Sequence, residues 1–537
     1  PYSVSKPANI LYLQNKSKAP AIICASAFKN PVSADYEIIF CANSVFFYIC
    51  ARYTEIMNII GRDREIKILK DYLNSERSEF IAVYGRRRVG KTFLIRMAAD
   101  DHFAFFVTGV HNAPLSEQLT NFAVALQRYS KAERLSIPKN WILAFYELSR
   151  YLESLPDGNK TIFIDELPWM DTPRSGFIAA LENFWNSWAS LRNDIKLIVC
   201  GSATSWIINN LIRNRGGLHN RLTYHLPLQP FNLSECEEYF RSYGFSYTRK
   251  QIAECYMAVG GIPYYLSMMD RSLSLAQNID RLFFAGDALL KDEFHDLYHA
   301  LFKNASPHTD VVTALASKGI GMTRAELLHT TGLTDNGAFS TVLEELEQCG
   351  FIRAYEPFRK THTVNEKRQK TNTVFQLMDF YTLFYYRFIL NNRYHDTHFW
   401  TNSMNSPLHS TWAGLAFERL CLSHLPQIKQ ALGISGVLTL ACSWRSTATE
   451  KGAQIDLLID RKDDTINLCE IKYVRDEFDI DKDYASALEN KINAFVSETQ
   501  TRKSVILTLI STFGIKKNKY SSLVQSEVML DDLFQKI

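Results

Sequence analysis

The sequence predicts an α/β protein of several domains, and three observations support this fold class. Short apolar runs at 80–84, 161–164 and 195–200 have the length of buried strands, and helical patterns separate them along the chain. That alternation is typical of a parallel sheet. Two helices and a hairpin are expected between 323 and 377, and a second α/β unit follows them. A chain of 537 residues has room for about three or four such domains.

Composition places the chain among ordinary globular proteins. Hydrophobic residues make up 46% of it and charged residues 22%, both usual for soluble domains. The net charge of +3 is too small to indicate nucleic-acid binding by itself. The ten cysteines include no Cys-x-x-Cys pair, so we predict neither a zinc site nor a disulfide framework. We expect reduced thiols and a cytoplasmic protein.

Residues 1–56 differ from the rest of the chain, because they show no clear helical or strand period. Their apolar run at 38–51 is interrupted by Asn43 and Ser44 and is shorter than the roughly 20 residues of a membrane helix. We therefore interpret 1–56 as an atypical N-terminal extension and expect no membrane partner. A membrane anchor is the less favoured alternative.

The segment 85–92 fits the pattern G-x-x-x-x-G-K-[ST], the phosphate-binding P-loop. It lies between the apolar run at 80–84 and a helical run that begins at Phe93, which is the context that the motif requires. Its backbone N–H groups form an anion nest, and the helix N-terminus adds partial positive charge. Lys91 is expected to reach the β- and γ-phosphates, and the Thr92 hydroxyl to hold Mg²⁺. The sequence thus predicts ATP and Mg²⁺ as cofactors. The expected nucleotide contacts here are Gly85, Arg86, Arg87, Arg88, Val89, Gly90, Lys91, Thr92 and Phe93.

Two acids end the apolar run at 161–164, in the arrangement called Walker B. Asp165 is expected to support Mg²⁺, and Glu166 to orient or deprotonate the attacking water. Ser202 ends the next strand and is a candidate sensor of the γ-phosphate, with a plain turn serine as the alternative. Arg221 is a candidate for stabilising transition-state charge. Arg213 and Arg215 are near it in sequence, and a surface arginine is the alternative for all three.

Five segments occur in an order that resembles the archaeal-type ATPase family, near the STAND and origin-recognition branches of the AAA+ class. They are Ile60-Gly61-Arg62, GRRRVGKT at 85–92, IDE at 164–166, GSATSW at 201–206 and GGIPYYL at 260–266. The resemblance covers about 57–300 and implies a P-loop NTPase core at 57–228 with a helical lid at 229–300.

The same resemblance assigns further nucleotide contacts. It implies that Ile60, Gly61 and Arg62 pack near the adenine, and that Pro263 touches the nucleotide from the lid. No clear lid arginine follows Pro263, which favours a slow switch over a ring-forming hydrolysis cycle.

Two strands of a hairpin are predicted near the C-terminus, at 452–460 and 466–473. Glu470 and Lys472 are two residues apart and therefore share one face of their strand, where Asp456 of the adjacent strand is expected to meet them. Asp456 and Glu470 would then hold Mg²⁺, with Lys472 positioning water or offsetting charge on a phosphodiester. Glu418, in a helical run upstream, is a candidate third ligand. The alternative is a solvent-facing strand edge with a cross-strand ion pair.

This Asp…Glu-x-Lys order resembles the PD-(D/E)XK nuclease superfamily over about 410–515. The resemblance implies a nuclease-like α/β domain at 385–537. Two functions stay open. One is an ATP-hydrolysing switch coupled to a DNA-directed nuclease-like domain. The other is an ATP-gated DNA- or protein-binding regulator whose nuclease fold is inactive.

The segment 301–384 is predicted to be a winged-helix domain, with 336–348 as its recognition helix. That helix carries Glu344, Glu345 and Glu347, and acids repel phosphate. Double-stranded DNA is a candidate partner through the wing, intramolecular packing is the alternative, and a homo-oligomer is a further candidate. The basic wing residues are Arg359, Lys360, Lys367, Arg368 and Lys370.

Overall fold

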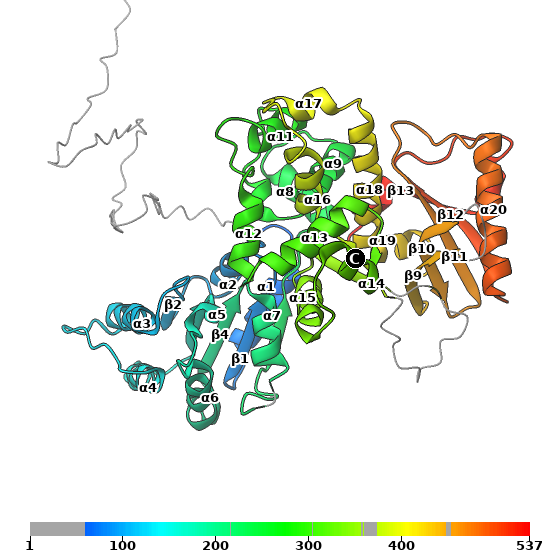
Figure 1. Cartoon of the computed structure of the whole chain (residues 1–537). Coiled ribbons are helices and arrows are strands. Elements are labelled where there is room, and N and C mark those ends of the chain that lie inside the picture. The colour runs from blue at the N-terminus through cyan, green and yellow to red at the C-terminus, as the bar shows by residue number, and fades with distance from the viewer. Residues whose placement is uncertain (1–58, 215, 303, 356–357, 359–372, 447–452) are drawn as a thin grey trace, which may run out of the picture. The chain divides into compact units, whose positions relative to one another are not determined.

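The structure is a computed structural model, drawn in Figure 1, and it describes most of residues 59–537. The residues it does not describe within that range are 215, 303, 356–357, 359–372 and 447–452. Three predictions therefore lie outside the described residues: the N-terminal extension at 1–56, the basic wing, and the candidate Arg215.

The first sheet has five parallel strands in the order β2-β3-β4-β1-β5. Every residue of β1 and β4 is buried, as helices on both faces of a parallel sheet require. The predicted parallel α/β sheet is confirmed, and its carboxyl edge brings the ends of β1, β3 and β4 together. The strands are β1 (Glu79–Tyr84), β2 (Phe105–Thr108), β3 (Lys160–Asp165), β4 (Ile195–Gly201) and β5 (Tyr224–Pro227).

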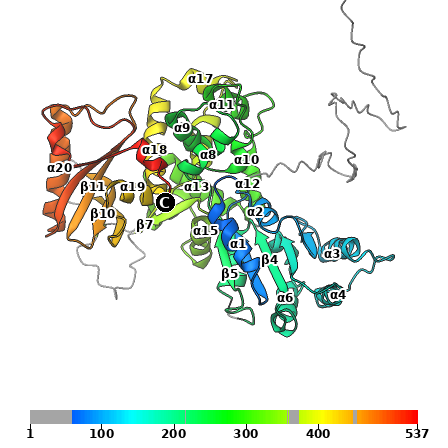
Figure 2. The ribbon, with the colours of Figure 1, turned by 180° about the vertical axis from the view of Figure 1, so that it is seen from behind.

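Helices cover both faces of this sheet (Figure 2). Ile81 and Val83 of β1 pack with α1 and α2 on one face, while Phe80 and Ala82 pack with α4 and α6 on the other. This period of two is the one that a strand buried on both sides must have. The helices are α1 (Asp63–Leu73), α2 (Lys91–Ala98), α3 (Leu115–Ser130), α4 (Trp141–Glu153), α5 (Leu167–Met170) and α6 (Phe177–Ser187).

The aromatic-rich helix α6 is followed directly by a tighter turn. It ends at Ser187, because Trp188 leaves the helical backbone with φ −136°, and a 3₁₀ turn at Ala189–Leu191 follows. After β4 the chain forms α7 (Thr204–Ile207) and a π-helical turn at Ile208–Ile212.

The segment 229–300 is helical, as predicted, and is interrupted at Gly260 and Gly261. A Cβ on Gly261 would lie 1.9 Å from the carbonyl oxygen of Phe231, so only glycine permits this close approach. Side-chain capping boxes begin α8, α9 and α11. The helices are α8 (Leu233–Ser242), α9 (Arg249–Val259), α10 (Pro263–Leu266), α11 (Leu275–Phe283) and α12 (Glu293–Leu301).

Between 301 and 384 the structure contains the expected pair of helices and the expected hairpin. Gly332, with φ +70°, ends the first helix of the pair, and the strands form a three-stranded antiparallel sheet in the order β6-β8-β7. The elements are α13 (Ser306–Lys318), β6 (Met322–Thr323), α14 (Arg324–Thr331), α15 (Gly337–Gln348), β7 (Ile352–Tyr355) and β8 (Val374–Leu377).

One helical segment crosses the boundary that we expected at residue 384. It consists of α16 (Phe380–Phe384) and a π-helical turn at Tyr385–Ile389. A single apolar cluster joins one face of the first sheet, the helices of 229–300 and the helices after 384, so Ile59–Ile537 forms one unit. The following helices are α17 (Phe399–Ser403), α18 (Pro407–Ser423) and α19 (Leu425–Ala431).

The C-terminal sheet is mixed, with the order β13-β12-β11-β10-β9. The predicted hairpin, β10 with β11, is antiparallel, and β11, β12 and β13 run parallel. Its elements are β9 (Thr439–Arg445), β10 (Gln454–Arg461), β11 (Thr465–Lys472), α20 (Lys482–Thr499), β12 (Ser504–Ser511), β13 (Ser526–Met529) and 3₁₀ turns at Ser521–Leu523 and Leu530–Phe534. Across the described part of the chain, none of the helices combines the length and apolarity needed to cross a bilayer.

Candidate nucleotide site and C-terminal carboxylate site

The predicted P-loop leaves β1 at the carboxyl edge of the first sheet. Gly85 has φ +146°, and a Cβ there would lie 2.3 Å from the carbonyl oxygen of Leu228, so the position requires glycine. Lys91 begins α2 and is buried, and its Nζ donates to the carbonyl oxygens of Gly85 and Arg86, both at 3.0 Å. The lysine is therefore held over the loop whose backbone would wrap a polyphosphate.

Asp165, at the end of β3, faces the P-loop. Thr92 Oγ1 donates to its Oδ2 at 3.0 Å, and the Glu166 backbone N–H donates to its Oδ1 at 2.9 Å. A hydroxyl and a carboxylate side by side are the oxygen ligands that Mg²⁺ takes, usually with water and phosphate completing the shell. The residues present thus fit the magnesium ion that the sequence predicts.

Cys200 is a contact of Asp165 that sequence reasoning missed. Its Sγ lies 2.6 Å from Asp165 Oδ1, and burial together with Asp165 raises the pKa of the thiol. The thiol therefore stays protonated and donates to the carboxylate. The sequence gives one indication of this contact: Cys200 is a residue with a hydrogen-bonding side chain near the end of β4, the strand beside the one that ends in Asp165.

Glu166 and Ser202 contact each other across the ends of β3 and β4. The Ser202 N–H donates to Glu166 Oε2 at 3.0 Å, and its hydroxyl donates to Oε1 at 3.0 Å. Glu166 itself has φ +45°, a left-handed backbone that is uncommon outside glycine. Ser202 thus fixes the direction of the glutamate carboxylate, a contact that the sequence did not predict.

Two of the three P-loop arginines are ion-paired with carboxylates far along the chain. Arg86 Nη1 lies 2.5 Å from Asp379 Oδ1, and Arg88 Nη1 lies 2.5 Å from Glu293 Oε2. Although burial opposes it, Asp379 raises the pKa of Arg86. Within the ranges that the structure describes, Arg87 has no ion pair.

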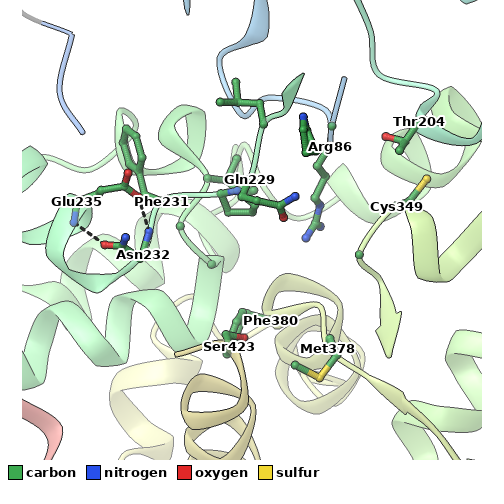
Figure 3. A pocket seen from close by; sticks show the side chains of 18 of the residues that line it. Arg86, Thr204, Gln229, Phe231, Asn232, Glu235, Cys349, Met378, Phe380 and Ser423 are labelled. Carbon is green, nitrogen blue, oxygen red and sulfur yellow. Dashed lines mark hydrogen bonds between the residues drawn. The ribbon is translucent and has the colours of Figure 1, made fainter. Parts of the chain in front are cut away.

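A cavity of about 590 Å³ lies beside Gly85 and Arg86 (Figure 3). Arg86 and Gln229 stand on one side of it, and Phe380 and Ser423 lie across from them. Its walls come from the first sheet, from 229–262 and from segments after 346.

Arg62 also lines this cavity and is almost fully buried. Its Nη2 donates to the Gln229 carbonyl at 2.6 Å, and its guanidinium lies 4.6 Å from the centre of the Phe231 ring. Arg62 Nη1 lies 3.9 Å from Glu235 Oε1. Burial lowers the pKa of Arg62 and raises the pKa of Glu235, and in each case it outweighs the opposing charge of the other residue.

Three other residues predicted to bind nucleotide lie near this cavity but do not line it. Ile60 packs on the core, and a Cβ on Gly61 would lie 2.9 Å from Glu235. Pro263 begins α10, directly after the lining residue Ile262.

Two predicted residues do not join the site. Arg221 is exposed in the turn before β5, and no side-chain contact in the described part of the chain links it to the P-loop. Phe93 is on α2 with 44% of its side chain exposed. Arg213, the neighbouring candidate, instead pairs with Glu344 of α15 at 2.7 Å.

In the C-terminal sheet, Glu470 and Lys472 lie together as predicted, with Lys472 Nζ 3.1 Å from Glu470 Oε1. Glu470 is directed toward α20, where Lys491 Nζ lies 2.8 Å from Oε2 and the Tyr484 hydroxyl donates to Oε1. Although burial opposes it, Lys491 and Lys472 lower the pKa of Glu470.

Asp456 lies elsewhere, beside Glu418 of α18. Burial raises the pKa of Glu418 and the charge of Asp456 raises it further, while Arg419, whose Nη1 lies 3.0 Å from Glu418 Oε1, opposes the shift. A β-bulge interrupts the pairing of β10 with β9 between Ile455 and Leu458. Those two residues pack on the α20 side, whereas Leu457 packs with the cluster that contains α18. The structure therefore brings Asp456 to Glu418 and Glu470 to two lysines. Among the described residues, no group of three potential ligands gathers at one point.

The three acids of α15 all have partners within the chain. Glu344 pairs with Arg213, Glu345 lies 2.8 Å from His308 Nε2, and Glu347 accepts from the Ala354 backbone N–H at 3.2 Å. The acidic face of the predicted recognition helix is thus used in intramolecular packing.

Comparison with known proteins agrees with the site in the first sheet. Residues 59–269 match the model of a family described as an ATPase domain predominantly from Archaea. This segment, which contains Lys91, Thr92, Asp165 and Glu166, is therefore an archaeal-type ATPase domain. An uncharacterized protein of Methanocaldococcus jannaschii, MJECL04, is 25% identical over 334 residues, which cover 62% of this chain and 69% of that protein.

Two solved structures show distant likeness. The Walker-type ATPase PABY2304 of Pyrococcus abyssi has 17% identity and a TM-score of 0.43, over 60% of this chain and 95% of that one. The ORC2 protein of Aeropyrum pernix, solved as ADPNP–ADP complexes, has 15% identity and a TM-score of 0.37, over 65% of this chain and 98% of that one.

Proposed function

We propose that this chain is a Mg²⁺-dependent ATP-hydrolysing switch. The observation that carries the proposal is the meeting of Lys91, Thr92, Asp165 and Glu166 at the carboxyl edge of one parallel sheet. The ATPase-family match over 59–269 supports it independently.

Each residue has a role in this proposal. Lys91 leaves its two carbonyl partners and contacts the β- and γ-phosphates, while the loop backbone N–H groups bind them. Thr92 and Asp165 would hold Mg²⁺, which neutralises charge on the phosphates when bound. Glu166 orients the attacking water, and Ser202 keeps its carboxylate directed toward that water. The nucleoside part occupies the cavity beside Gly85, next to Arg62.

The proposal is tested by ATP binding and hydrolysis assays on the full chain, with Mg²⁺ and with EDTA. Lys91→Ala should abolish binding, since the motif loses the cation that reaches the phosphates. Glu166→Gln should keep binding and lose hydrolysis. Lys67→Ala, at an exposed position of α1, is the matched control and should behave as wild type. Normal turnover by the Glu166→Gln variant would show that the Walker B assignment is wrong.

For the C-terminal domain we propose a binding role, in which a nuclease-like fold contacts DNA or protein under control of the ATP state. The supporting observation is the separation of Asp456, beside Glu418, from Glu470, which two lysines neutralise. In this arrangement Asp456 and Glu470 do not meet as two metal ligands beside Lys472. Incubation of plasmid DNA with the full chain and Mn²⁺ should give no nicking. Nicking that disappears in Glu470→Ala would instead establish the nuclease alternative.

A further inference from the structure

Asp379 holds the P-loop from outside the ATPase-family segment. Its side chain is 3% exposed and lies 2.5 Å from Arg86. The same carboxylate caps α16 by accepting from the Thr382 backbone N–H at 2.9 Å. Because the cap fixes the carboxylate, the position of Arg86 is fixed as well.

Glu293 holds the loop on a second side, from the first residue of α12. It accepts from the Tyr265 hydroxyl at 2.8 Å and pairs with Arg88 at 2.5 Å. The Arg88 guanidinium also lies 4.4 Å from the centre of the Tyr264 ring. Arg88 has φ +69°, a left-handed conformation that is unfavourable for a non-glycine residue. Side-chain contacts that hold Arg88 therefore help to maintain this loop conformation.

The segment 301–384 also reaches the nucleotide site through other contacts. The Phe351 ring lies under Arg86, with 4.8 Å between the guanidinium carbon and the ring centre. Cys349, at the end of α15, lies against Thr204, two residues after Ser202. The docked position of 301–384 is therefore tied both to the P-loop and to the Ser202 segment.

We propose that Asp379 and Glu293 are positioning residues for the P-loop. Through them, nucleotide binding is coupled to the docking of α12, by Glu293, and of the segment 301–384, by Asp379. The inference rests on the proposed function, because it requires that phosphates bind the loop. Phosphates bind the backbone of Arg86 and Arg88, whose side chains form these ion pairs. A change in loop conformation on phosphate binding therefore changes the geometry of the ion pairs. A buried guanidinium is unfavourable without its carboxylate, and linkage makes the coupling reciprocal.

Two charge-removing variants test the proposal on the full chain. Asp379→Asn keeps a good helix cap and removes only the charge. Glu293→Gln removes the charge that pairs with Arg88 and keeps the length of the side chain. Each should weaken ATP affinity about fivefold or more. The rate constant at saturating ATP should change less than about twofold, since Glu166 and Asp165 stay in place. Asp335→Asn is the matched control, because Asp335 pairs with Arg324 at an exposed site of the same segment.

Hydrogen exchange supplies a readout that a merely structural role would not move. In wild type, ATP should change exchange in α15 and α16, and in Asp379→Asn that response should be lost. Wild-type affinity in both variants, or an unchanged exchange response, would overturn the inference. Absence of ATP binding by wild type would instead contradict the proposed function, so the two failures are distinguishable.

Discussion

The sites at Asp165 and at Glu470 are predicted from equally short acidic motifs at the ends of buried strands. At Asp165 the structure gathers the predicted site residues. Thr92 donates to Asp165 at 3.0 Å, and the adjacent Glu166 accepts from Ser202, a contact that the sequence did not predict. At Glu470 it gathers Lys472 and Lys491 but not Asp456. The first motif therefore predicts correctly which distant residue its carboxylate meets, and the second does not.

The reason lies in the kind of sheet. In a parallel sheet the carboxyl ends of neighbouring strands meet at one edge, whatever the details of each strand. In an antiparallel hairpin the face of a side chain depends on register, and a shift of one residue moves it to the other face. The bulge between Ile455 and Leu458 produces such a change next to Asp456.

The largest expected effect separates the two aspartates. Asp165→Asn should lower ATP hydrolysis about 100-fold or more, because the proposed carboxylate ligand for Mg²⁺ and the partner of Thr92 is lost. Asp456→Asn should leave hydrolysis as in wild type. Steady-state ATPase assays on both variants measure the difference. Equal losses would mean that the C-terminal sheet contributes to the ATP site and that the contrast between the regions is wrong.

The next effect concerns Glu470 as a structural carboxylate. Glu470→Gln should lower the free energy of unfolding by about 2 kcal/mol, because charge-assisted bonds from Lys491 and Tyr484 are lost. Denaturant unfolding measures the change, and Glu489→Gln, at an exposed position of α20, is the control. An increase in stability would show that the carboxylate is strained in place, as expected of a metal ligand kept ready for binding.

The destabilisation by Glu470→Gln should depend on pH. The neighbouring lysines hold the pKa of Glu470 below its usual value of 4.5, so its contribution is fully present above that pH. It is lost as the pH falls through the lower, folded-state pKa. The difference in melting temperature between wild type and variant should therefore be full at pH 7 and shrink in acid below pH 4.5. A difference that grows in acid would contradict the assigned direction.

The smallest effect is expected at the surface contact between the ATPase domain and α15. Arg213 and Glu344 are both more than half exposed, so Arg213→Ala should change stability by less than about 1 kcal/mol. A double-mutant cycle with Glu344→Gln measures the pair, at low and high salt. A coupling above that range would mean that this contact, and not only the buried Arg86 pair, secures the docking of 301–384.

The sequence by itself determined the elements whose patterns are local. Buried runs such as 80–84, the glycine-requiring P-loop, and Asp165 with Glu166 at a strand end are each specified by neighbouring residues. The parallel α/β sheet and the edge that carries the nucleotide site follow from them, because the carboxyl ends of parallel strands always lie at the same edge of the sheet.

Only the tertiary structure decided which distant groups meet. Asp379 and Glu293 carry no motif, yet they neutralise Arg86 and Arg88 because helices after the ATPase domain pack over the P-loop. Asp456 joins Glu418 because a bulge changes its face. The docking of these helices and the register of these strands depend on packing throughout the core. A short stretch of sequence does not specify that packing.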